Sequence, residues 1–162
     1  MSQISSFLNA LGLGNVVNNV KGSKPEDILQ TFIKVLHLPK HIDKASLGDD
    51  LVERESLGST AIGYGYAMPH PRKRIMNDEH AAIIAVAYLE NPVEWSSPDG
   101  RPVEVLFLLL SGEDRQHLTF ISEIASIVND LGFREFMTKK PQKDKIIEYL
   151  SERYLLNPKA TR

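Results

Sequence analysis

Two of the five histidines stand where an imidazole could do chemistry. His70 lies between Pro69 and Pro71, directly after a glycine-rich stretch. Proline fixes the backbone φ angle and removes an N–H donor, so this arrangement would hold an imidazole rigidly at the end of a strand, pointing at a site. A loop histidine that merely has proline neighbours is the commoner outcome of such a pattern, and spacing alone does not separate the two interpretations.

His117 stands about one turn into a predicted amphipathic helix. It shares a stripe with Ile121, Ile124 and Val128, so we expect its ring to face the body of the protein. The start of a helix carries partial positive charge and free N–H groups, which attract anions such as phosphate. A buried, hydrogen-bonded core histidine fits the same spacing and, without further context, is the more frequent case.

Other kinds of active site find little support in the sequence. Cysteine is absent, which excludes a cysteine nucleophile and any thiolate metal site. There is no GxSxG elbow, no HExxH spacing and no Walker A sequence, and Gly63-Tyr64-Gly65 lacks the third glycine of a dinucleotide fingerprint. We therefore expect neither a metal nor a cofactor.

Length and charge restrict the kinds of protein that this chain can be. The 162 residues suit one domain, and 19 basic against 21 acidic residues give a net charge of −2, so we expect no nucleic-acid partner. The basic triplet Arg72-Lys73-Arg74 could steer an anionic partner, but it is interpreted as a solvated loop. No apolar run approaches the roughly 20 residues that span a bilayer, and the N-terminus lacks the features of a signal peptide. We expect a cytoplasmic protein without membrane insertion.

Hydrophobic periodicity predicts the elements that must position the two histidines. The first 14 residues are expected to form a loose helical turn and residues 15–20 an edge strand. Ser23 and Glu26 resemble a capping box, opening a helix that ends near residue 37, and a shorter helix is expected to run from after Ser46 to Arg54. Residues 81–89 and 103–110 are nearly all apolar and predict strands buried on both faces.

The C-terminal part is predicted to be helical. The helix that carries His117 is expected to end at Gly132, a helical turn follows over 133–138, and Pro141 is expected in the first turn of a final helix that reaches Tyr154. Strands and helices together indicate an α/β domain.

A longer motif surrounds the first histidine. Residues 54–70 read RESLGSTAIGYGYAMPH, which matches R-E-x-x-G-S-T-x-I-G-x-G-x-A-x-P-H at every position. This segment resembles the signature of the fructose/mannitol-type EIIA domains of the bacterial phosphotransferase system, and it is most similar to the nitrogen-regulatory IIA (PtsN-like) branch. The resemblance extends from about Val16 to Tyr149 and includes Trp95 and the pair His117-Leu118.

The resemblance implies a fold, domain limits and roles for three residues. The fold would be a single-domain α/β sandwich, with a central mixed β-sheet flanked by helices. The EIIA type-2 domain would span residues 15–154, between an N-terminal extension (1–14) and a C-terminal tail (155–162). His70 would be the phosphoryl acceptor, His117 would hydrogen-bond the phosphoryl group, and Arg54 would stabilise its charge.

The resemblance also implies partners. An HPr-type phosphocarrier would donate the phosphoryl group, and the recipients would be a IIB domain or regulatory target proteins. We expect a mainly regulatory phosphocarrier of the nitrogen-regulatory type; a sugar-specific transport IIA subunit and a non-phosphorylated contact regulator stay open as alternatives. The chain departs from the family at Pro71, where glycine commonly follows the acceptor: the proline removes an N–H that could contact phosphate, and Arg72-Lys73-Arg74 changes the charge of the docking face.

Overall fold

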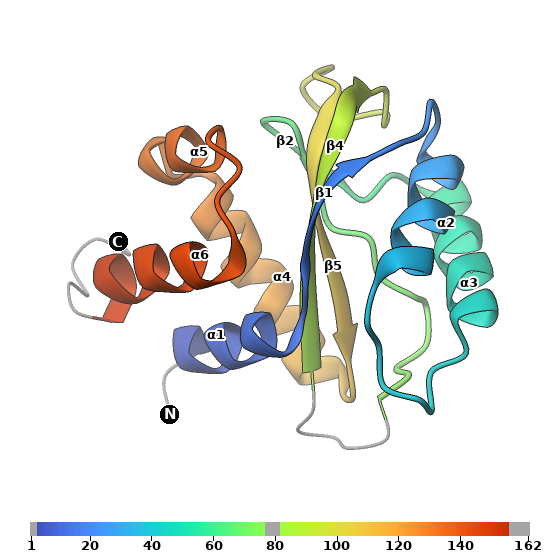
Figure 1. Cartoon of the computed structure of the whole chain (residues 1–162), viewed down its shortest axis with the longest axis horizontal. Coiled ribbons are helices and arrows are strands. Elements are labelled where there is room, and N and C mark those ends of the chain that lie inside the picture. The colour runs from blue at the N-terminus through green and yellow to red at the C-terminus, as the bar shows by residue number, and fades with distance from the viewer. Residues whose placement is uncertain (1–2, 77–81, 156–162) are drawn as a thin grey trace.

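The computed structural model describes residues 3–76 and 82–155, which form one mixed sheet between two layers of helices (Figure 1). The strands are β1 (Val16–Val20), β2 (Ala61–Gly63), β3 (Tyr66–Ala67), β4 (Ala82–Val93) and β5 (Val103–Ser111). The helices are α1 (Gln3–Leu13), α2 (Pro25–Val35), α3 (Lys44–Leu57), α4 (Asp114–Val128), α5 (Leu131–Met137) and α6 (Lys143–Leu150), which continues into a π-helical turn, η1 (Ser151–Leu155).

The five strands lie in the order β1-β4-β5-β3-β2. β4 and β5 pair antiparallel in the centre, β1 and β3 each add a parallel neighbour, and β2 pairs antiparallel with β3 at the other edge. Helices α2 and α3 cover one face, while α1, α4, α5 and α6 cover the other (Figure 1). The predicted α/β sandwich with a central mixed sheet is thus confirmed, as is the edge position of β1.

The two central strands divide the core into two clusters. Successive side chains of a strand point to opposite faces, so Ile84 and Val86 pack under α1 and α4, whereas Ile83 and Ala85 pack under α2 and α3. All four are at most 4% exposed. This two-sided burial was predicted from the nearly unbroken apolar runs, and it makes the middle of the sheet a rigid platform.

The N-terminal half differs from the sequence prediction in three places. The expected loose turn is an 11-residue helix, α1, whose Phe7 is 1% exposed and lies edge-on to Phe120 of α4. Helix α3 begins before Ser46, at Lys44, because the Asp43 carboxylate caps it by accepting the N–H of Ala45. The capping box at Ser23 does not form, since its hydroxyl donates to the Asp27 side chain instead.

The C-terminal half also differs at element boundaries. Helix α4 ends at Val128, and Gly132 lies inside α5, where Asp130 accepts its N–H at 3.0 Å and caps that helix. Pro141 precedes α6 and is not in its first turn; its carbonyl accepts the hydroxyl of Tyr88 at 2.7 Å. The domain limits at residues 15 and 154 stay a prediction, and residues 156–162 of the proposed tail lie outside the described part.

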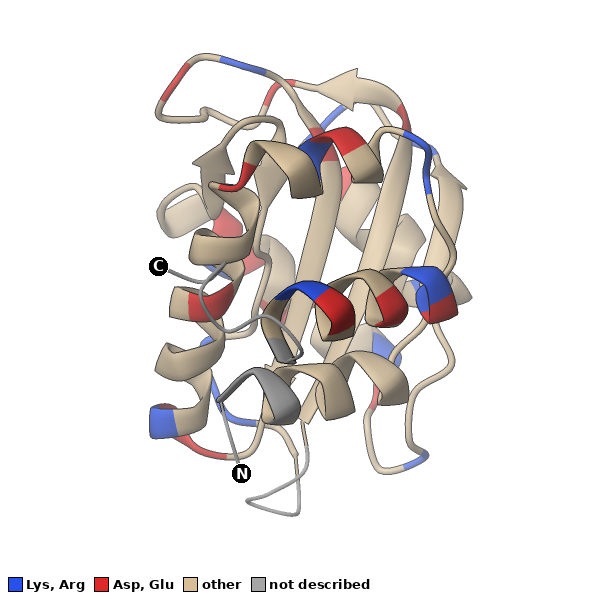
Figure 2. Ribbon diagram, turned by 90° about the vertical axis from the view of Figure 1, so that its left-hand side faces the viewer, with Lys and Arg blue, Asp and Glu red and all other residues tan. Residues whose placement is uncertain are grey.

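Charge is mixed on the side of the molecule drawn in Figure 2, where lysines and arginines alternate with acidic residues along the helices. Helix α1 carries no charged residue, and its buried side chains Phe7, Leu8 and Leu11 pack into the core. Across residues 3–76 and 82–155, no helix has the length and apolar character needed to cross a membrane.

Candidate active site

The backbone leading to His70 is fixed on both sides. The N–H of Met68 donates to the carbonyl of Thr60 at 3.0 Å, and the N–H of Leu109 in β5 donates to the carbonyl of Pro69 at 3.0 Å. The main chain therefore stays bonded to its neighbours beyond β3, up to the residue before the histidine. Pro71 is buried and follows at once. As the flanking prolines predicted, His70 is held rigidly at the end of a strand.

One ring nitrogen of His70 already makes a hydrogen bond. Its Nδ1 lies 2.9 Å from the carbonyl oxygen of Met68. A carbonyl oxygen only accepts hydrogen bonds, so Nδ1 of the neutral ring carries the proton. The lone pair of the imidazole then lies on Nε2, which makes Nε2 the nucleophilic atom of this residue.

His117 lies beside that ring. Its side chain comes from the second turn of α4 and is 7% exposed, so it faces the body of the protein as predicted. The ring centroids of His70 and His117 are 4.7 Å apart, with their planes at 67°. The backbone N–H of His117 is already bonded to the carbonyl of Glu113 at 3.1 Å, so any free helix N–H groups belong to the preceding turn.

Both histidines are neutral near pH 7. Burial lowers the pKa of His117 to about 4, and the positive charges of Arg74 and Arg54 act in the same direction. Burial also lowers the pKa of His70, an effect opposed by the hydrogen bond to Met68 and reinforced by the same two arginines. One neutral ring can attack an electrophile while the other presents a single N–H.

Arg54 occupies the last turn of α3 and is half-buried. Its Nη1 donates to the carbonyl of Gly58 at 2.8 Å, so it satisfies a carbonyl just beyond the end of its own helix. Because its charge acts on both histidines, the structure brings Arg54, His70 and His117 into one electrostatic environment at the same end of the sheet. The catalytic roles of the three stay a prediction.

A half-buried carboxylate, that of Glu55, fastens the loop that precedes the site. Glu55 accepts the backbone N–H and the hydroxyl of Thr60, both at 2.6 Å, and also the indole N–H of Trp95 at 2.8 Å. This network ties the end of α3 to the segment that leads into β2 and β3. It gives a structural reason for the glutamate and the threonine of the motif, which sequence reasoning did not supply.

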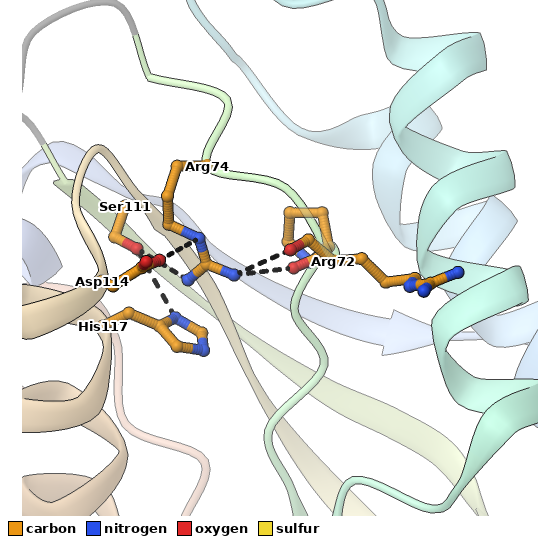
Figure 3. A network of polar contacts seen from close by, with 6 residues as sticks. Arg72, Arg74, Ser111, Asp114 and His117 are labelled. Carbon is orange, nitrogen blue, oxygen red and sulfur yellow. Dashed lines mark hydrogen bonds and ion pairs between the residues drawn. The ribbon is translucent and has the colours of Figure 1, made fainter.

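Arg74 is a residue of the site that sequence reasoning missed. We interpreted Arg72-Lys73-Arg74 as a solvated loop, and Arg72 is indeed exposed, pairing with Glu53 at 3.4 Å. The side chain of Arg74 is instead only 19% exposed and turns towards Ser111 and the start of α4 (Figure 3). Three consecutive basic residues look alike in sequence, so only the path of the loop identifies the one that folds back.

A metal centre finds no ligand set in the described residues. Over 3–76 and 82–155, no three or more His, Cys, Asp or Glu side chains are grouped as ligands for a metal ion. The arrangement that is present offers one imidazole nucleophile, one N–H donor and two guanidinium charges. That set suits the transfer of an anionic electrophile such as a phosphoryl group.

Fold and site together define a class: an α/β protein whose mixed sheet presents two facing, neutral histidines at one end. Residues 10–153 match the family described as "Phosphoenolpyruvate-dependent sugar phosphotransferase system, EIIA 2". The chain belongs to this EIIA family, as the motif ending at His70 predicted. It is therefore a component of a phosphoryl-transfer system.

Known relatives agree with this membership. A nitrogen regulatory protein of Pseudomonas aeruginosa is 31% identical over 139 residues, which cover 83% of this chain and 88% of that protein. The nitrogen regulatory protein of Escherichia coli is 32% identical over 131 residues, covering 79% of this chain and 77% of that protein. The solved structure of nitrogen regulatory protein IIA-Ntr from Neisseria meningitidis superposes with a TM-score of 0.73 at 26% identity, over 84% of this chain and 92% of that chain.

Proposed function

We propose that this protein is a regulatory phosphocarrier of the nitrogen-regulatory IIA type, which accepts a phosphoryl group on Nε2 of His70 from an HPr-type carrier. The observation that carries the proposal is the facing pair of neutral imidazoles, 4.7 Å apart, in which Nδ1 of His70 is bonded to a carbonyl and Nε2 is left to react. The nitrogen regulatory relatives support the regulatory type.

The chemistry balances without any proton having to move. The N–P bond of the carrier's phosphohistidine breaks as a bond forms between phosphorus and Nε2 of His70. The lone pair of Nε2 supplies the new bond, and the electron pair of the broken bond returns to the carrier's ring, which becomes neutral. The ring of His70 takes up the positive charge, and its Nδ1–H keeps donating to the carbonyl of Met68 at 2.9 Å. The step is reversible because each ring can serve as nucleophile or leaving group.

The neighbouring groups would lower the barrier by position and charge. His117 would donate its N–H to a phosphoryl oxygen, and Arg54 would stabilise the negative charge that the group carries. Because the donor's N–P bond is already activated, the protein has to supply mainly alignment. A His117→Ala variant, which has no side-chain N–H, should therefore keep the acceptor and be phosphorylated more slowly; an unchanged rate would contradict the role given to His117.

The partners and the cellular setting are part of the same proposal. The donor would be an HPr-type protein in the cytoplasm, and the output would be contact with regulatory target proteins or transfer to a IIB domain. A fructose-specific EIIABC component of Bacillus subtilis is relevant to the alternative of a sugar-specific transport subunit: it is 24% identical over 138 residues, which cover 21% of its length. A IIB domain that takes the phosphoryl group at a rate matching sugar uptake would favour that alternative.

The test is intact-mass analysis of the full chain after incubation with phosphoenolpyruvate, enzyme I and an HPr-type carrier. We expect the mass to rise by one acid-labile phosphoryl group in the wild type and to stay unchanged in a His70→Ala variant that keeps the native circular dichroism spectrum. Full labelling of the variant would refute His70 as acceptor. No labelling of the wild type by HPr or by its nitrogen-branch counterpart would favour the contact regulator.

A further inference from the structure

Arg74 joins three segments of the site (Figure 3). Its Nη2 donates to the carbonyls of Pro71 and Arg72, both at 3.2 Å, and so closes the loop that follows the acceptor histidine. Its Nη1 donates to Oγ of Ser111 at the end of β5, at 3.3 Å, and its Nε lies 3.6 Å from Oδ1 of Asp114 in the first turn of α4. A planar guanidinium with five N–H donors suits this three-way contact.

Ser111 links this clamp to the second histidine. The serine is 3% exposed, and its Oγ lies 3.5 Å from Nδ1 of His117. Oγ already accepts an N–H from Arg74, and among residues 3–76 and 82–155 the hydroxyl has no acceptor other than the histidine ring. The hydroxyl hydrogen is therefore directed at Nδ1. A neutral ring that accepts at Nδ1 carries its proton on Nε2.

We propose that Arg74 is a positioning residue of this site and acts through Ser111 on the second histidine. By orienting the serine hydroxyl, Arg74 fixes His117 as an Nε2–H donor to the phosphoryl group that the acceptor receives. The inference rests on the proposed function, because it assigns that donor to the group carried by His70.

The surroundings of the clamp support this assignment. The two imidazole rings are close enough, at 4.7 Å between centroids, for a phosphoryl group on one to meet an N–H on the other. The charge of Arg74 also lowers the pKa of His117, so the ring keeps a single proton whose place is decided by the serine. Pro71 offers no N–H to a phosphate, so an N–H from the side chain of His117 would replace a contact that the backbone after the acceptor cannot make.

The first test reads the tautomer and needs no phosphorylation. Two-bond ¹H–¹⁵N correlation spectra of the full chain, labelled with ¹⁵N-histidine, identify which ring nitrogen of His117 is protonated at pH 7. We expect the Nε2–H form in the wild type and a shift towards a mixture of the two tautomers in Arg74→Gln and in Ser111→Ala. Arg101→Gln is the matched control, since this exposed arginine precedes β5 at the end away from Ser111 and should leave the spectrum unchanged.

The second test measures the rate at which the same proteins gain a phosphoryl group from the carrier. Groups that hydrogen-bond and orient a metal-binding histidine are typically worth about 10- to 100-fold in activity. By analogy, we expect a loss of that order in Arg74→Gln and a wild-type rate in Arg101→Gln. Thermal unfolding of each variant checks that the fold is intact. Ser111→Ala, which removes only the hydroxyl, tests the same link if the glutamine variant does not fold.

The outcomes separate the two proposals. An Nδ1–H tautomer in the wild type, or a His117 spectrum that responds to neither substitution, would overturn the inference even if His70 is phosphorylated normally. If no carrier phosphorylates the wild type, but the tautomer of His117 still shifts in Arg74→Gln and Ser111→Ala, the link from Arg74 to His117 would be upheld. That second result would overturn the proposed function and, with it, the donation to a phosphoryl group.

Discussion

Lowering the pH from 7 to 5 should destabilise this protein through a buried histidine. The pKa of His117 falls from 6.5 to about 4 on folding, mainly because the ring is buried, with the positive charges of Arg74 and Arg54 acting in the same direction. Between pH 7 and pH 5 the ring in the unfolded chain binds a proton, whereas the ring in the folded chain stays mostly neutral. Stability therefore falls as the pH falls.

The size of the effect follows from the same two pKa values. At pH 5 the unfolded ring is almost fully protonated and the folded ring is mostly neutral, which favours the unfolded state by at most about 2 kcal/mol relative to pH 7. His70 adds to the effect in the same direction, because its pKa is also lowered by burial. The loss is a large fraction of the roughly 5–15 kcal/mol that stabilises a domain.

The assay is urea unfolding at pH 7, 6 and 5, on the wild type and on His117→Gln. Because the glutamine does not titrate, the variant should lose about 2 kcal/mol less than the wild type over this range. Comparing each protein with itself at pH 7 removes the cost of the substitution, and the carboxylates titrate in both. Equal losses in the two proteins would refute the burial of a neutral imidazole at this position.

Further predictions concern the framework around the site. Gly14→Ala should cost about 1–3 kcal/mol or more, because its Cβ would lie 2.0 Å from the backbone oxygen of Ile84. A Cβ at Gly12, in α1, would have nothing within 4 Å. Gly12→Ala should therefore leave the stability of the fold unchanged or raise it by up to about 1 kcal/mol. Thermal unfolding of the two alanine variants compares them, and equal effects would contradict the packing of α1 on the sheet. Glu55→Gln should lower the free energy of unfolding by about 1–3 kcal/mol, because the glutamine amide would turn an N–H towards one of the three groups that donate hydrogen bonds to Glu55. The fluorescence of Trp95, the single tryptophan, should change with it, and an unchanged spectrum and stability would argue against the network.

Much of the fold follows from local pattern. Residues 105–110 are apolar without alternation, as expected of a strand covered on both faces. The orientation of His117 follows from its stripe on α4, because helical periodicity fixes which side chains face the sheet. Helix α1 was underestimated, since serines and asparagine interrupt its apolar positions and its stability comes from contacts with α4, such as that of Phe7 with Phe120.

The site was predictable only in part, for a related reason. The motif ending in His70 identifies the acceptor candidate, and the helical spacing turns His117 inward, but neither pattern says that the two rings lie 4.7 Å apart. That distance depends on how β3 and α4 meet at the end of the sheet. The part played by Arg74 is even harder to predict from the sequence, because it depends on a loop that folds back onto Ser111.

The most direct test of the central claim is to locate the phosphoryl group on the phosphorylated, ¹⁵N-histidine-labelled chain. We expect a one-bond ¹⁵N–³¹P coupling at Nε2 of His70, with Nδ1 still protonated and bonded to the carbonyl of Met68. A coupling at Nδ1 of His70, or at a nitrogen of His117, would contradict the assignment of nucleophile and donor. A phosphorylated chain in which no histidine nitrogen is coupled to phosphorus would contradict the proposed chemistry altogether.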